Sequence, residues 1–153
     1  MQKYAKTILC AYPHLDSIIT QIENLIRNKA RNSFYIYDNT QKVVEQILRL
    51  GEIAKLLYIL KTIAEEVLVS LTPSERELIS FKYFGIVPER PDFEHVSRNY
   101  FRKQVKALNT FSSRLIESGY DENWFKEKYL KIAFIAGIYK KVQSEEGKKH
   151  VKY

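Results

Sequence analysis

A long stretch of helical periodicity dominates the middle of the chain. Between residues 43 and 71, apolar side chains recur in alternating steps of three and four: Val43, Ile47, Leu50, Ala54, Leu57, Leu60, Ala64, Val67 and Leu71. This spacing lines one face of an α-helix, whereas a half-buried strand would alternate at every second residue. The pattern predicts one helix of roughly thirty residues, bent at Gly51, since one glycine costs only about 1 kcal/mol relative to alanine.

A second helix is predicted just before this segment, from about Pro13 to Ala30. Proline suits the first turn of a helix, where its missing N–H would have no partner anyway. The two helices would run antiparallel, as a hairpin within residues 1–70. Residues 4–12 form either a short helix or an extended lead-in.

The segment between the two helices interrupts the pattern. Asn32 and Ser33 favour turns. Residues 34–37 could form a short strand, but we expect a packed loop because the sequence offers no partner strand. Asp38 is then a suitable N-cap for the long helix, with Gln41 at its third position.

The predicted hairpin carries a second apolar edge, made of Val44, Leu48, Tyr58, Ile63 and Leu68. A helix with apolar side chains on two faces has to bury both. The partner is either the C-terminal half or another copy of the chain, which would make the hairpin a homodimer surface. In the second case, a charge at Leu57 or Leu60 is expected to abolish self-association.

Residues 71–85 carry the clearest helix signals in the sequence. Thr72 is a suitable N-cap, Pro73 takes the first helical position, and Glu75 completes a capping box. Gly85 suits the left-handed conformation that ends many helices. Residues 86–96 contain two prolines, so we expect a loop there with at most one helical turn, from Asp92 to Val96.

The window from Ser97 to Leu115 contains five basic residues and no carboxylate. Ser97 can cap a helix that runs to about Ser118, before Gly119. Its predicted buried stripe is Phe101, Val105, Leu108, Ser112 and Leu115, with Gln104 and Phe111 beside it. The basic side chains lie on other parts of the helix, so one face can be buried while a cationic face stays exposed, as a helix on nucleic acid requires.

One more helix is predicted after Asp121, with a buried stripe of Phe125, Tyr129, Ile132, Ala136 and Tyr139. We expect residues 144–153 to be a basic, disordered tail. With only 5 Gly and 4 Pro in 153 residues, the chain favours long helices, and we predict an all-α fold. A single cysteine, no signal-peptide core and no apolar run near ~20 residues indicate a cytoplasmic protein with no membrane partner.

The run LTPSERELISFKYFG, at residues 71–85, resembles the start of region 4 of sigma-70-type sigma factors. In that family, such a helix packs behind a helix-turn-helix. The later run SRNYFRKQVKAL is similar to the recognition helix of the same region. The layout of a helical N-terminal part and a sigma-like C-terminal part is similar to that of ArpU-type phage and Gram-positive transcriptional regulators.

The resemblance covers about residues 71–116 and implies that residues 71–143 bind DNA as a helix-turn-helix part with a C-terminal helix. It also implies that Ser97, Arg98 and Arg102 face DNA. The family has a full helix between the two matching runs, whereas Pro88 and Pro91 occupy that interval here. The first helix of the motif is therefore expected to be truncated.

The resulting hypothesis is a DNA-binding transcriptional regulator that places helix 97–116 in the major groove of double-stranded DNA. Arg98 and Arg102 could contact guanine, and Asn99 could contact adenine. Phosphate contacts are expected from Lys103, Lys106 and Thr72, whereas Tyr100 could face either the DNA or the core. RNA polymerase is a further candidate partner.

The alternative is a helical adaptor protein that binds no nucleic acid. An enzyme is not expected, because the three histidines are scattered and none has a partner at ligand spacing. Cys10 is expected to be a small buried apolar residue. No cofactor and no metal site are predicted.

Overall fold

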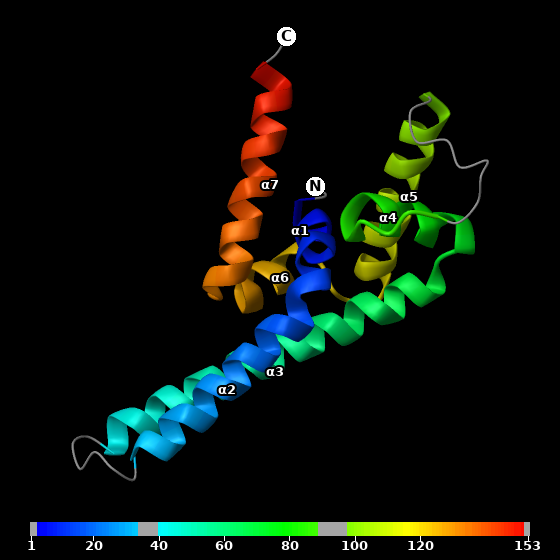
Figure 1. Ribbon diagram of the computed structural model, residues 1–153. Coiled ribbons are helices and arrows are strands. Elements are labelled where there is room, and N and C mark those ends of the chain that lie inside the picture. Colours follow the sequence, from blue (N-terminus) through cyan, green and yellow to red (C-terminus); the bar gives the residue numbers. More distant parts are fainter. Residues whose placement is uncertain (1–2, 34–39, 89–97, 152–153) are drawn as a thin grey trace. The chain divides into compact units, whose positions relative to one another are not determined.

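The computed structural model describes the backbone of residues 3–33, 40–88 and 98–151, and the side chains of 3–32, 41–88 and 98–145. These segments contain α-helices and one short 3-10 helix, without a strand, which confirms the all-α class (Figure 1). The elements are α1 (Lys3–Ala11), η1 (Tyr12–His14), α2 (Leu15–Ser33), α3 (Thr40–Ser70), α4 (Pro73–Phe84), α5 (Arg98–Glu117), α6 (Glu122–Tyr129) and α7 (Ala133–Val151).

Several sequence-based predictions fall outside the described residues. These are the loop or strand at 34–37, the Asp38 cap, the helical turn from Asp92 to Val96, and the Ser97 cap. The alternatives for residues 4–12 are decided, because α1 is a helix over this segment.

The chain divides into two compact units. One unit comprises residues 1–13 and 63–153, and we refer to it as the core unit. The other comprises residues 14–62 and is called the two-helix unit. The sequence placed all of residues 1–70 in one part, whereas here α1 and the end of α3 belong with the C-terminal helices.

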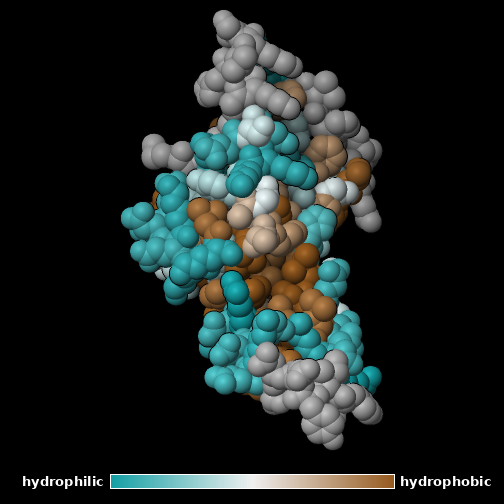
Figure 2. Space-filling model, turned by 90° about the vertical axis from the view of Figure 1, so that its left-hand side faces the viewer, coloured by the Kyte–Doolittle hydropathy of each residue, from teal (hydrophilic) through white to brown (hydrophobic). Residues whose placement is uncertain are grey.

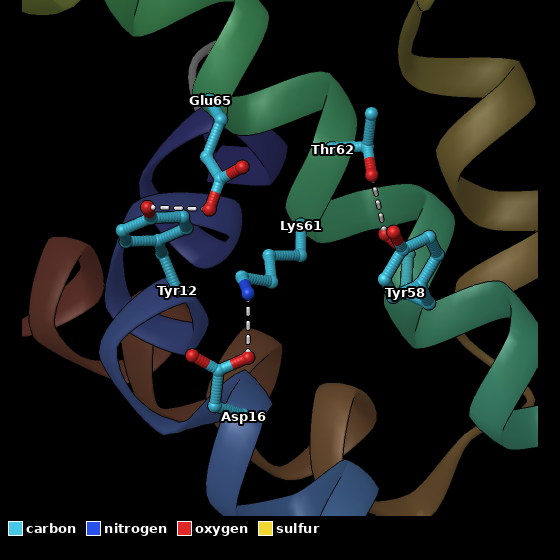
Figure 3. A network of polar contacts seen from close by, with 6 residues as sticks. All are labelled: Tyr12, Asp16, Tyr58, Lys61, Thr62 and Glu65. Atoms are coloured by element: carbon cyan, nitrogen blue, oxygen red, sulfur yellow. Dashed lines mark hydrogen bonds and ion pairs between the residues drawn. The ribbon is translucent and has the colours of Figure 1, made fainter.

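In the two-helix unit, α2 and residues 40–62 of α3 run antiparallel, and polar contacts join them near both ends. Lys61 Nζ lies 2.6 Å from Asp16 Oδ1 (Figure 3). At the other end, Lys29 Nζ donates to Gln46 Oε1 at 3.0 Å. Asp16 also lies in the first turn of α2, where the helix dipole favours a negative charge.

Leu57 and Leu60 of α3 are fully buried. A charge at either position would therefore disrupt the interior of the monomer, so these substitutions are not a specific test of self-association. The second apolar edge is also divided: Ile63 and Leu68 are buried, whereas Val44, Leu48 and Tyr58 are exposed.

The core unit is built around α1, which contacts α4, α5 and α7. Tyr4 and Ile8 of α1 are fully buried, and the Tyr4 ring lies 5.9 Å from that of Phe125 in α6. The Tyr4 hydroxyl donates to the carbonyl oxygen of Tyr120 at 3.2 Å, which ties α1 to the segment between α5 and α6. In η1, directly after α1, the Tyr12 hydroxyl donates to Glu65 Oε1 at 3.0 Å (Figure 3).

The C-terminal helices agree with the prediction at their first cap and differ from it in their continuity. Asp121 caps α6 as predicted, by accepting from the Trp124 N–H at 2.9 Å. The single helix that was predicted is broken, however, because a tight turn with an Ile132 N–H bond to the Tyr129 carbonyl separates α6 from α7. This turn lets both Tyr129 and Ile135 lie in the core.

The tail also differs from the expectation, because α7 continues to Val151 through the segment that was predicted to be disordered. The segment contains three lysines and two glutamates, and these straight-chain residues lose little rotamer freedom in a helix.

Candidate nucleic-acid interface

Helix α4 forms as the sequence predicted. The Thr72 hydroxyl accepts from the Glu75 N–H at 3.2 Å, and the Glu75 carboxylate accepts from the Thr72 N–H at 3.1 Å. Pro73 follows the cap, and Gly85 ends the helix in the left-handed region with φ of 69°. The capping box and the left-handed end fix the length of α4, which packs against α5.

Helix α5 buries a stripe that overlaps the predicted one, since Leu108, Ser112 and Leu115 are buried as predicted, but it differs in the first turns of the helix. Its buried residues are Tyr100, Gln104, Ala107, Leu108, Phe111, Ser112 and Leu115. Phe101 and Val105 were predicted to be buried but are 56% and 57% exposed. Both stripes obey the same helical period, so the spacing alone could not distinguish them.

Packing against α4 explains which stripe is buried. The Tyr100 ring meets that of Phe81 edge-on, with 6.0 Å between centroids. Gln104 Nε2 donates to the Tyr100 hydroxyl at 2.9 Å, so the buried amide has a partner inside the protein. This arrangement gives Tyr100 a core position, the second of the two alternatives that the sequence left open.

The opposite face of α5 is basic. Arg98, Asn99, Arg102, Lys103 and Lys106 are all exposed. Within the described segments, no carboxylate forms an ion pair with Arg98, Arg102 or Lys103. The structure therefore keeps five of the eight candidate DNA contacts together on one exposed face.

Two large apolar side chains lie among these cations. Phe101 and Val105 line an open hollow of about 470 Å³ together with Arg98 and Arg102. The sequence interpretation missed this feature because it assigned both residues to the core. The available signal was the competing stripe through Tyr100, Gln104, Ala107 and Phe111, which also steps by four, three and four.

The two remaining candidate DNA contacts, Ser97 and Thr72, gain no support from the structure. Ser97 lies outside the described residues. The Thr72 hydroxyl is engaged by the cap, and it also donates to Glu75 Oε1 at 2.9 Å. A carboxylate so close to Thr72 would repel a phosphate, which argues against the expected contact.

The carboxyl group of Glu75 has a lowered pKa. Burial raises the pKa, but the hydrogen bonds from Thr72 and Thr110 and the positive charge of Lys106 outweigh this effect. Glu75 therefore stays ionised at neutral pH and attracts Lys106. Of the basic side chains on α5, Lys106 is thus partly compensated by α4.

The residues considered for catalysis do not gather into a site. Burial raises the pKa of the Cys10 thiol, which keeps it protonated and weakly nucleophilic at neutral pH. Across the described residues, no three His, Cys, Asp or Glu side chains are grouped to hold a metal ion. His14 is exposed, and the side chains of the other two histidines fall outside the described part.

None of the helices described is both long and apolar enough to cross a bilayer. No family model matches the chain, and neither the curated proteins nor the solved structures give a match. The functional interpretation accordingly depends on the chemistry of α5 and its surroundings.

Proposed function

We propose that this protein is a cytoplasmic, DNA-binding transcriptional regulator without enzymatic activity, and that α5 is its recognition helix. The single observation that supports this most strongly is the exposed set of Arg98, Arg102 and Lys103, none of which forms an ion pair with a carboxylate of the described residues. Cations without carboxylate partners attract the phosphate backbone and release its counterions on binding. RNA polymerase remains a candidate partner.

The proposed docking places the N-terminal part of α5 in the major groove. Arg98 and Arg102 lie one turn apart and can each form a bidentate contact with guanine. Phe101 and Val105 lie beside them and can contact thymine methyl groups, which are the apolar features of that groove. Asn99 is exposed and can pair with adenine.

In this proposal, α4 and α5 are the first and last helices of a sigma region 4-like helix-turn-helix. Support comes from the capped α4 and its packing against α5. Lys103 and Lys106 contact phosphates and set the register on the duplex.

The first prediction concerns two double variants that separate base contacts from phosphate contacts. Arg98→Ala/Arg102→Ala should weaken binding to a selected target duplex by about 1–3 kcal/mol per lost guanine contact and relax sequence preference. Lys103→Ala/Lys106→Ala should instead reduce the slope of log K against log salt by about 1.8, since each phosphate contributes roughly 0.9. Fluorescence anisotropy over a salt series measures both effects.

The control is Lys140→Ala/Lys141→Ala, which removes the same charge from an exposed part of α7. If this control loses as much affinity as the α5 variants, binding reflects only net charge. If the wild-type protein shows no salt-dependent retention on DNA, the proposal is wrong.

A helical adaptor remains the second candidate, because exposed Phe101 and Val105 would also suit an apolar protein partner. An adaptor predicts no salt-dependent retention on heparin or DNA resin. Loss of partner capture by Phe101→Asp, without any effect of Arg98→Ala/Arg102→Ala, would favour this function.

A further inference from the structure

Helix α3 carries apolar side chains on two opposite faces. One face packs inward, through Leu57 and Leu60. The other is exposed: Leu48 is 63% and Tyr58 61% accessible, and Val44 is also exposed. Figure 2 shows that hydrophobic side chains reach the surface on the face drawn there. Since a helix that is apolar on two faces is normally covered on both, the exposed face calls for a partner.

The exposed face follows the spacing of a coiled coil. Its residues, which we call the α3 seam, are Val44, Leu48, Gly51, Lys55, Tyr58 and Thr62. They are separated by alternating steps of four and three, the pattern that keeps one stripe against a second helix. All of them belong to the two-helix unit.

The described residues make no close approach to Gly51 that would explain a glycine there. A Cβ atom built there meets nothing within 4 Å, and the helix continues through this position. Glycine is among the least favourable residues for a helix interior. A second helix packed close to the seam would explain the glycine, because the absence of a side chain leaves room for a long side chain of the partner.

Charge indicates which partner fits. Lys55 is the only charged residue in the seam, and Glu52 lies at its edge next to Gly51. In a parallel, in-register pair, Lys55 would face its own copy and repel it. In an antiparallel pair, Leu48 lies opposite Tyr58 of the second copy. Lys55 then lies opposite Gly51 of the second copy, next to the negatively charged Glu52 of that copy.

Thr62 at the end of the seam needs no acceptor from a partner. Its hydroxyl donates to the carbonyl oxygen of Tyr58 at 3.1 Å, within the same helix (Figure 3). The seam can therefore be covered by an apolar surface without leaving a buried hydroxyl unpaired.

We propose that the α3 seam is a homodimer interface, in which a second copy of this chain packs antiparallel across Gly51. The interface is self-complementary, as a twofold axis requires. It uses no residue of α5, so it does not depend on the proposed DNA binding.

Sedimentation equilibrium of the full chain over a wide concentration range tests this interface. The wild-type protein should show a monomer–dimer equilibrium, and Leu48→Glu or Tyr58→Glu should raise its dissociation constant by at least about tenfold. Val87→Glu is the matched control, because Val87 is 72% exposed but follows α4 in the core unit and is not part of the seam. This control should leave the equilibrium unchanged.

The charge pattern provides a second arm. Lys55→Glu should weaken the dimer, and the double variant Glu52→Lys/Lys55→Glu should restore it. Circular dichroism verifies that each variant stays helical, as expected for changes at exposed positions. A wild-type monomer at all concentrations, a dimer that survives both Leu48→Glu and Tyr58→Glu, or a charge swap that fails to restore it would each overturn the proposal.

Discussion

At the scale of single residues, the burial of one aromatic residue in α5 determines that the next one is exposed. Tyr100 and Phe101 are adjacent aromatic residues, but only Tyr100 lies in the core. The hydrogen bond from Gln104 and the edge-on contact with Phe81 hold Tyr100 inward. Phe101 consequently faces outward beside two arginines and becomes part of the candidate interface.

This difference predicts unequal costs for two substitutions of the same residue type. Phe111 is fully buried, so Phe111→Ala should lower the free energy of unfolding by about 3–5 kcal/mol. Phe101→Ala should change it by no more than about 0.5 kcal/mol, as is usual at exposed positions. Urea denaturation followed by circular dichroism measures both, and equal losses would contradict the buried stripe described for α5.

At the scale of elements, one carboxylate at the N-terminus of α4 takes part in two stabilising interactions. The Glu75 carboxylate closes the capping box and lies near Lys106 of α5, so the same group stabilises a helix end and attracts a neighbouring helix. Its pKa is lower in the folded protein than in the unfolded chain, because the hydrogen bonds and Lys106 favour the charged form.

The stability of the protein should therefore depend on pH through Glu75. A lowered folded pKa contributes stability that is present above the unfolded pKa and is lost as the pH falls through the folded pKa. Glu75→Gln should be less stable than the wild type at neutral pH, and the difference should shrink toward acid pH. Thermal denaturation between neutral and acidic pH tests this, and a difference that does not vary with pH would contradict it.

At the scale of the whole molecule, the two units differ in how much they bury. The core unit contains fully buried residues from α1, α4, α5, α6 and α7. In the two-helix unit, side chains 41–56 of α3 are all exposed or half-buried. Because this part of α3 buries little apolar surface, its stability must depend largely on its own helical hydrogen bonds and on any partner.

Hydrogen exchange should reveal this difference. Amides of residues 41–56 should exchange faster than those of residues 107–115, because local opening there exposes little new apolar surface. If the α3 seam dimerises, protection of 41–56 should rise with protein concentration while that of 107–115 stays constant. Equal protection of both segments at low concentration would contradict the unequal burial.

The sequence by itself determined the all-α class, the capped limits of α4 and the cap of α6, because periodicity and capping are local properties. It also located the basic residues of α5. Only the tertiary structure decided which of two equally periodic stripes of α5 is buried, that a turn divides α6 from α7, and that α1 packs with the C-terminal helices. These outcomes depend on which distant side chains fit together, and Phe81 against Tyr100 is the contact that turned Phe101 and Val105 toward the surface.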